Sequence, residues 1–144
     1  MEKTVANLEE FDREAAGFAG TLMPQAESAT LVTLSGELGA GKTAFVKAVA
    51  RAFGILNTVN SPTFVLEKIY GIPGNAFKHL VHIDAYRFKE GSEIQHLNFN
   101  ELMRDEKNLI MLEWPERVEG VLPDPTVRIS LTAHPDGTRT ISYA

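Results

Sequence analysis

Residues 36–43 read Gly36-Glu37-Leu38-Gly39-Ala40-Gly41-Lys42-Thr43, which matches the phosphate-binding P-loop pattern at every required position. In this pattern the glycines let successive backbone N–H groups turn toward one point, where phosphate oxygens bind. The lysine supplies positive charge for the outer phosphates, and the final hydroxyl is placed to bind Mg²⁺. The start of the next helix adds unpaired N–H groups and the positive end of its dipole. We therefore predict a site for ATP or ADP with Mg²⁺.

The segments on either side of the loop support this prediction. Residues 29–34 are apolar enough for a buried strand, and residues 43–53 have helical spacing of apolar side chains, with Gly54 as a stop. Strand, glycine-rich loop and helix is the setting that a P-loop requires, and it disfavours the alternative of a glycine-rich turn without a ligand. The predicted nucleotide contacts on the loop and the first helical turn are Glu37, Leu38, Gly39, Ala40, Gly41, Lys42, Thr43 and Ala44.

Composition restricts the class of protein. The chain has 144 residues, of which 44% are hydrophobic and 23% charged, so we expect one globular domain over residues 1–144. A net charge of −5 argues against a chain that grips a nucleic-acid backbone on its own. The absence of cysteine excludes disulfides and thiolate chemistry. With no apolar run of membrane-spanning length and no signal-peptide pattern, we expect a cytoplasmic protein without membrane contact.

The rest of the chain predicts a single-domain α/β P-loop NTPase, with a mixed parallel and antiparallel sheet flanked by helices. A helix is expected from about Leu8 to Met23, and short helices within residues 89–106. The apolar run 109–112 is typical of a central strand. Two antiparallel hairpins are expected, one from strands 64–70 and 78–84 and the other from strands 127–131 and 138–143.

A P-loop needs an acidic partner on a neighbouring strand, to hold Mg²⁺ or to orient water. Asp84 closes the apolar run 80–84, and Glu113 closes the run 109–113. Because ligands of open α/β sheets lie beyond the carboxyl ends of the strands, both carboxylates are expected to face the nucleotide. The alternative for each residue alone is a solvated carboxylate at a strand end. We predict that Lys42, Asp84 and Glu113 are catalytic.

Several neighbouring residues keep two interpretations. Strand periodicity places His82 on the side of Asp84, which it could tune, although a packed structural histidine is the favoured interpretation. Trp114 either covers the nucleotide or forms a hydrophobic corner with the proline that follows. Ser61 and Thr63 lie where a switch-like loop would meet the γ-phosphate, or else cap a turn before a strand.

Four boxes carry a resemblance to one family. Besides the P-loop, they are Ser61-Pro62-Thr63-Phe64, His82-Ile83-Asp84-Ala85-Tyr86-Arg87 and Glu113-Trp114-Pro115-Glu116-Arg117. In this order and at these separations, they resemble the bacterial TsaE family, the ATPase component of tRNA threonylcarbamoyladenosine biosynthesis. The resemblance spans about Leu8 to Pro123 and is weakest in residues 127–144. Glu37, Ala44 and Phe88 depart from residues that are frequent in the family, and Ala44 removes a hydroxyl beside the P-loop.

The resemblance implies a weak Mg²⁺-dependent ATPase that works with the tRNA threonylcarbamoyl-transferase subunit and that subunit's inactive paralogue. Its ATP cycle would support repeated turnover of the transferase on adenosine 37 of tRNAs that read codons beginning with A. Contact with tRNA would be indirect, through the complex. Carried over by position, Thr43 and Glu113 would bind Mg²⁺. Asp84 would be the second essential acid and would bind Mg²⁺ directly or through water, and Trp114 would lie near the nucleotide.

Two further functions stay open from the residues alone. A small P-loop kinase would need a lid and a substrate domain, and the chain is short and shows no evident lid. A nucleotide-dependent binding switch with negligible catalysis is the other candidate. A guanine-specific switch is disfavoured because the sequence contains no Asn-Lys-x-Asp motif.

Overall fold

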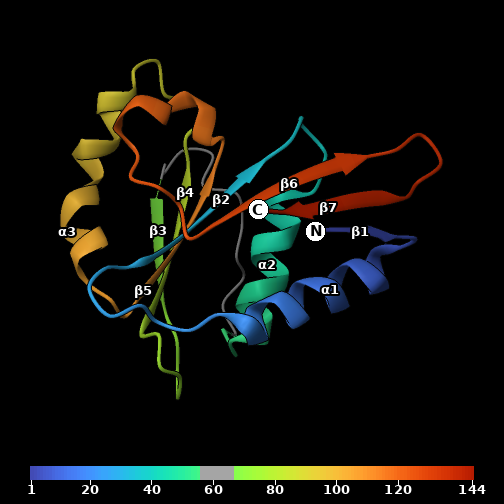
Figure 1. Ribbon diagram of the computed structural model, residues 1–144, viewed down its shortest axis with the longest axis horizontal. Coiled ribbons are helices and arrows are strands. Elements are labelled where there is room, and N and C mark those ends of the chain that lie inside the picture. Colours follow the sequence, from blue (N-terminus) through green and yellow to red (C-terminus); the bar gives the residue numbers. More distant parts are fainter. Residues whose placement is uncertain (56–66) are drawn as a thin grey trace.

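Helices cover both faces of one sheet in this chain, whose computed structural model describes residues 1–55 and 67–144 (Figure 1). The strands are β1 (Glu2–Val5), β2 (Thr30–Ser35), β3 (Glu67–Gly71), β4 (His79–Asp84), β5 (Asn108–Glu113), β6 (Val127–Ala133) and β7 (Arg139–Tyr143). The α-helices are α1 (Leu8–Thr21), α2 (Lys42–Ala52) and α3 (Phe99–Arg104). The 3₁₀ helices are η1 (Gly91–Leu97), η2 (Pro115–Arg117) and η3 (Glu119–Val121).

The strand order in the seven-stranded sheet is β1-β7-β6-β2-β5-β4-β3. Strands β6, β2, β5 and β4 pair in parallel, whereas β1, β7 and β3 add to the two sides in antiparallel pairs. The predicted mixed sheet is therefore confirmed, as are the β3–β4 and β6–β7 hairpins. The described part of the first hairpin begins at residue 67, so residues 64–66 of the predicted strand lie outside the described residues.

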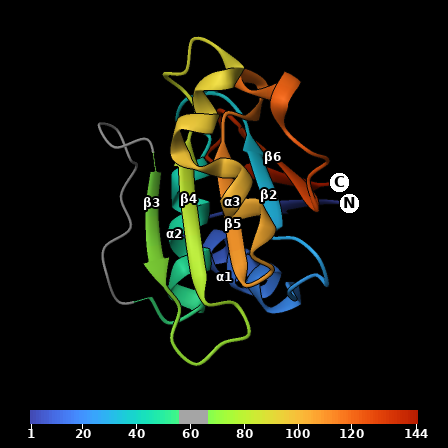
Figure 2. The ribbon, with the colours of Figure 1, turned by 90° about the vertical axis from the view of Figure 1, so that its left-hand side faces the viewer.

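Two hydrophobic cores lie on opposite faces of the sheet, with α1 and α2 on one side and α3 on the other (Figure 2). Strand β5 contributes side chains to both cores, because alternate side chains of a strand point to opposite faces. Leu109 and Met111 belong to the core with α1 and α2, while Ile110 and Leu112 belong to the core with α3. Burial on both faces explains why residues 109–112 form a continuous apolar run.

Helix α1 begins where the sequence predicts, because Asn7 caps it. The backbone N–H of Glu10 donates to Asn7 Oδ1 (2.9 Å), and the Glu10 carboxylate accepts from the backbone N–H of Ala6 (2.9 Å). This arrangement resembles a capping box, with the difference that the Glu10 carboxylate accepts from Ala6, the residue before the N-cap. The helix ends at Thr21 rather than at the predicted Met23. Pro24 gives the physical reason, since a proline disfavours helical backbone at the residue before it.

Strand β1 is not predicted from the sequence, and neither are the short 3₁₀ helices η2 and η3. Strand β1 pairs antiparallel with β7, from Glu2 opposite Ser142 to Val5 opposite Arg139. Only Val5 of its four residues is buried, so the segment has no alternating pattern of its own. Its position depends on pairing with the far end of the chain, and this brings the two termini side by side (Figure 1).

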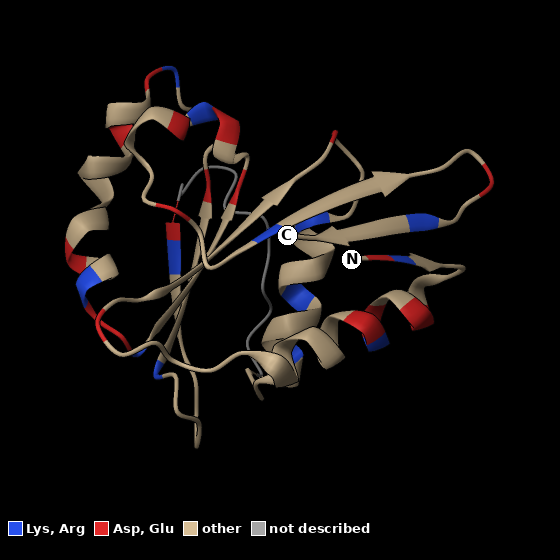
Figure 3. Cartoon of the chain, in the orientation of Figure 1, with Lys and Arg blue, Asp and Glu red and all other residues tan. Residues whose placement is uncertain are grey.

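No helix within residues 1–55 and 67–144 has both the length and the apolar character needed to cross a membrane. Basic residues are scattered over helices and strands in Figure 3.

Candidate functional site

Two glycines of the loop between β2 and α2 combine a positive φ with little room for a side chain. Gly36 has φ of 146°, and a Cβ at this position would lie 2.5 Å from the backbone oxygen of Leu131. Gly41 has φ of 110° and precedes the first residue of α2, where a Cβ would meet the Phe11 ring at 3.3 Å. A side chain at either position would be strained by the backbone and by these neighbours. The two glycines of the sequence motif are thus required by the local geometry.

Lys42 folds back over this loop. Its ammonium group donates to the backbone oxygens of Gly36 (2.5 Å) and Glu37 (2.8 Å). The same nitrogen lies 4.2 Å from the centre of the Trp114 ring, within the range of a cation–π contact. The residue is only 5% exposed. The positive charge is therefore held inside the curve of the loop.

The electrostatic surroundings of Lys42 act in opposite directions. Burial lowers the pKa of the Lys42 ammonium, because an apolar environment disfavours the charged form. The negative charges of Glu113, Glu116 and Asp84 oppose that shift. The ammonium group thus has three carboxylates within electrostatic range.

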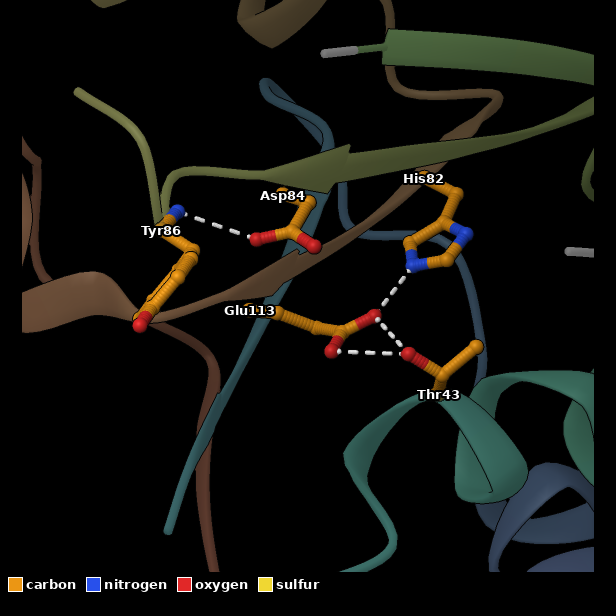
Figure 4. Close-up of polar contacts among 5 residues, drawn as sticks. All are labelled: Thr43, His82, Asp84, Tyr86 and Glu113. Carbon is orange, nitrogen blue, oxygen red and sulfur yellow. Dashed lines mark hydrogen bonds and ion pairs between the residues drawn. The ribbon is translucent and has the colours of Figure 1, made fainter. Parts of the chain in front are cut away.

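Glu113 is the centre of a buried polar cluster (Figure 4). The Thr43 hydroxyl lies 3.0 Å from Glu113 Oε1 and 2.9 Å from Oε2, and His82 Nε2 lies 2.6 Å from Oε2. The glutamate is 2% exposed. A buried carboxylate is costly unless hydrogen bonds compensate for lost hydration, and these two donors supply them. The cluster joins the first turn of α2 to β4 and β5.

Asp84 ends β4 directly opposite Glu113, which ends β5. It is half-buried, and its Oδ1 accepts from the backbone N–H of Tyr86 (3.0 Å). Parallel strands bring their carboxyl ends to the same edge of the sheet, as predicted from the apolar runs that end at Asp84 and Glu113. Lys42, Thr43, Asp84 and Glu113, predicted from segments far apart in the chain, therefore meet at one site.

Trp114 follows Glu113 in the left-handed region, with φ of 61°. Its backbone N–H donates to the oxygen of Leu34 (3.1 Å), and its ring packs against Tyr86, with ring centres 4.8 Å apart. With the Lys42 contact, these interactions place the indole beside the P-loop. The predicted contact between Trp114 and the nucleotide stays a prediction.

The other predicted nucleotide contacts differ in exposure. Leu38 is 71% exposed at the tip of the loop, whereas Ala40 is buried. The backbone N–H of Ala40 donates to the backbone oxygen of Glu37 (3.1 Å). Ala44 is half-buried in the first turn of α2. Their roles remain predictions. The predicted switch-like loop at Ser61 and Thr63, with the whole Ser-Pro-Thr-Phe box, lies outside the described residues.

His82 is a packed core residue, which is the interpretation that the sequence favours, whereas its hydrogen bonding does not support the alternative that it tunes Asp84. The imidazole is fully buried, and its hydrogen-bond partner is Glu113 rather than Asp84. Pairing along a single strand suggests Asp84, two residues away. In the sheet, His82 pairs with Met111, so Glu113 is its diagonal neighbour on β5. The register of residues 80–84 against 109–113 is the signal that identifies this contact.

The oxygens of Thr43 and Glu113 suit Mg²⁺, which prefers hydroxyl, carboxylate and phosphate oxygens. Within the described residues, no group of three or more His, Cys, Asp and Glu side chains is arranged to hold a metal ion. Mg²⁺ at nucleotide sites is commonly bound by one or two protein groups together with phosphates and water. The donor set at the start of α2 fits that arrangement.

The family described as threonylcarbamoyl adenosine biosynthesis protein TsaE matches residues 9–141. The chain belongs to the TsaE family. Its relatives named tRNA threonylcarbamoyladenosine biosynthesis protein TsaE include one from Rickettsia typhi, 36% identical over 83% of this chain and 81% of the relative. Another, from Treponema pallidum, is 37% identical over 82% of this chain and 84% of the relative.

The fold of this TsaE family member also resembles a solved structure. The crystal structure of YdiB from Bacillus subtilis superposes with a TM-score of 0.77 and 27% sequence identity. The match covers 99% of this chain and 83% of YdiB. The family resemblance and the fold predicted from the sequence are thus both confirmed.

Proposed function

We propose that this protein binds ATP with Mg²⁺, hydrolyses it slowly, and thereby supports formation of threonylcarbamoyladenosine in tRNA. The observation that carries the proposal is the contact between the Thr43 hydroxyl and the Glu113 carboxylate, beside the buried Lys42 ammonium. A hydroxyl, a carboxylate and a lysine at the start of a P-loop helix are the parts that phosphoryl-transfer sites use.

The residues of the site have distinct proposed roles. The amides of the loop and the start of α2 bind phosphate oxygens. The Lys42 ammonium, which donates to the backbone oxygens of Gly36 and Glu37 in this structure, donates to phosphate oxygens when the nucleotide is bound. Thr43 and Glu113 hold Mg²⁺, which when bound neutralises charge that develops on the phosphates. Asp84, at the end of the adjacent strand, is the second acid and orients water or the metal.

The tRNA pathway comes from the relatives' names, which assign them to tRNA threonylcarbamoyladenosine biosynthesis. We propose the same pathway here, with the threonylcarbamoyl-transferase subunit and its inactive paralogue as partners in the cytoplasm. The net charge of −5 favours indirect contact with tRNA through that complex. The transfer reaction on adenosine 37 belongs to the transferase, and ATP turnover supports its repeated cycles.

Phosphate release from ATP tests the proposal, measured with the purified chain alone and with the two transferase subunits plus tRNA. We expect slow Mg²⁺-dependent release that the partners stimulate and that Glu113→Gln lowers by about 10- to 100-fold. Unchanged release in the presence of the partners would contradict the accessory role. Transfer of the phosphoryl group to an acceptor would instead identify a kinase, and nucleotide binding without any release would identify a binding switch.

A further inference from the structure

We propose that His82 is a positioning residue for Glu113, and that it fixes the carboxylate orientation required for Mg²⁺-dependent nucleotide binding. The inference rests on the proposed function, since it gives Glu113 a metal to bind. It concerns a side chain that no step of the proposed reaction uses. The starting observation is the distance of 2.6 Å between His82 Nε2 and Glu113 Oε2, in a pair that is almost completely buried.

Because the His82–Glu113 pair is buried, the Glu113 carboxylate depends on hydrogen bonds from neighbouring side chains. His82 is 0% exposed and Glu113 is 2% exposed, so water has little access to either side chain. A carboxylate in such surroundings depends on protein donors to compensate for its lost hydration. Within the described residues, Thr43 and His82 are the side chains that donate to Glu113.

Thr43 and His82 differ in which carboxylate oxygen of Glu113 they can hold in place. Thr43 has one hydroxyl proton, so its contacts with the two carboxylate oxygens share a single donor and leave the choice between them open. His82 contacts Oε2 alone. The histidine therefore distinguishes the two oxygens, occupies Oε2 and directs Oε1 away from itself (Figure 4).

The tautomer follows from the same contacts. A carboxylate accepts hydrogen bonds, so Nε2 of His82 carries the proton that is donated to Glu113. Nδ1 of this ring is buried and has no hydrogen-bond partner within the described residues. Among the residues that the structure describes, the one polar contact of the ring is therefore with Glu113.

The sheet explains why a histidine fits here. His82 pairs with Met111 across β4 and β5, so its ring extends diagonally toward Glu113 at the end of β5. Strand β5 lies between β2 and β4, and β4 lies between β5 and β3, so both strands are hydrogen-bonded on their two sides. A histidine on one of these strands adds a second fixed contact to Glu113 besides that of Thr43. Such outer partners orient metal ligands, and losing one commonly weakens metal affinity by about 10- to 100-fold.

Nucleotide affinity measured with and without Mg²⁺ separates positioning from general stability. We would titrate ADP, in Mg²⁺ and in EDTA, into the wild-type chain and into His82→Gln, His82→Asn and His82→Leu. The glutamine amide reaches about as far as imidazole Nε2 and keeps a donor there, whereas asparagine is too short and leucine has no donor. The control is His79→Leu, which removes an exposed histidine from the start of the same strand.

We expect the Mg²⁺-dependent gain in ADP affinity to persist in His82→Gln and His79→Leu. It should fall about 10-fold or more in His82→Asn and His82→Leu, while affinity in EDTA stays within about 2-fold of wild type. The wild-type gain surviving in His82→Asn or His82→Leu would overturn the positioning role, as would its loss in all three His82 variants. If His82→Leu fails to fold, the comparison of His82→Asn with His82→Gln decides the outcome.

The same titration separates this inference from the proposed function. A wild-type chain whose ADP affinity is unaffected by Mg²⁺ overturns both, because Glu113 would then have no metal to bind. A wild-type chain with a clear gain, retained in every His82 variant, overturns only the positioning role.

Discussion

The Thr43 hydroxyl lies 2.9 Å and 3.0 Å from the two carboxylate oxygens of Glu113, although 70 residues separate them in the chain. One residue belongs to the first turn of α2 and the other ends β5. The contact therefore ties the P-loop helix to the carboxyl edge of the parallel strands. The predicted metal-binding hydroxyl and carboxylate are in direct contact with each other.

Replacing Lys42 with alanine should nearly abolish ATP binding. Its ammonium group is buried at the inner side of the loop, where it neutralises phosphate charge in the proposed complex. Calorimetric titration with ATP would measure the loss. Lys47→Ala is the matched control on the same helix and should bind ATP normally. Wild-type affinity in Lys42→Ala would contradict the P-loop assignment.

Removing the charge of either acid should slow turnover without unfolding the chain. Glu113→Gln and Asp84→Asn keep the side-chain shape, so we expect folded proteins whose Mg²⁺-dependent phosphate release falls by about 10- to 100-fold. Circular dichroism checks the fold, and a phosphate-release assay with the partner subunits checks turnover. The exposed Glu119→Gln serves as control. Normal turnover in both acid variants would mean that another residue supplies the acid.

Gly36→Ala should destabilise the loop. The added Cβ would approach the Leu131 oxygen to 2.5 Å at φ of 146°, so the backbone must shift. We expect a loss of more than about 1 kcal/mol in the free energy of unfolding, together with weaker nucleotide binding. Gly17→Ala, in α1 with open space around its Cβ, should instead gain about 0.5–1 kcal/mol. Urea denaturation distinguishes the two, and equal effects would refute the steric explanation.

Phe11→Ala tests the packing of α1 against the loop between β2 and α2. Phe11 is fully buried, meets the Phe45 ring edge-on with centres 5.9 Å apart, and lies beside Gly41. Truncation should lower the free energy of unfolding by about 3–5 kcal/mol, since it removes buried area and leaves a cavity. Leu8→Ala, at a residue 60% exposed, should change it by less than about 0.5 kcal/mol. A small effect of Phe11→Ala on the urea midpoint would show that the core readily closes around the missing ring.

Much of the fold follows from local patterns in the sequence. The P-loop, the Asn7 cap and the apolar runs of β2 and β5 each rely on neighbours within a few residues, which is why their positions are predicted to within two residues. Strand β1 is not predicted because it has one buried residue and depends on β7, at the other end of the chain. Its formation is a tertiary effect.

The site shows the same division between local and long-range information. Asp84 and Glu113 are identifiable because each ends an apolar run, and parallel strands end at a common edge. The partner of His82 requires the register between β4 and β5, which no single segment contains. The position of Trp114 over Lys42 depends on a left-handed backbone at a tryptophan, a conformation that sequence patterns rarely predict.

The most direct test of the site is the effect of Mg²⁺ on ADP affinity in wild type, Thr43→Val, Glu113→Gln and the double variant. If Thr43 and Glu113 bind one metal ion together, Mg²⁺ should tighten ADP binding in wild type and should have little effect in either single variant. The double variant should then lose no more than the single variants, because the two residues act as one unit. A full Mg²⁺-dependent gain in both single variants would contradict the proposed Thr43–Glu113 metal site.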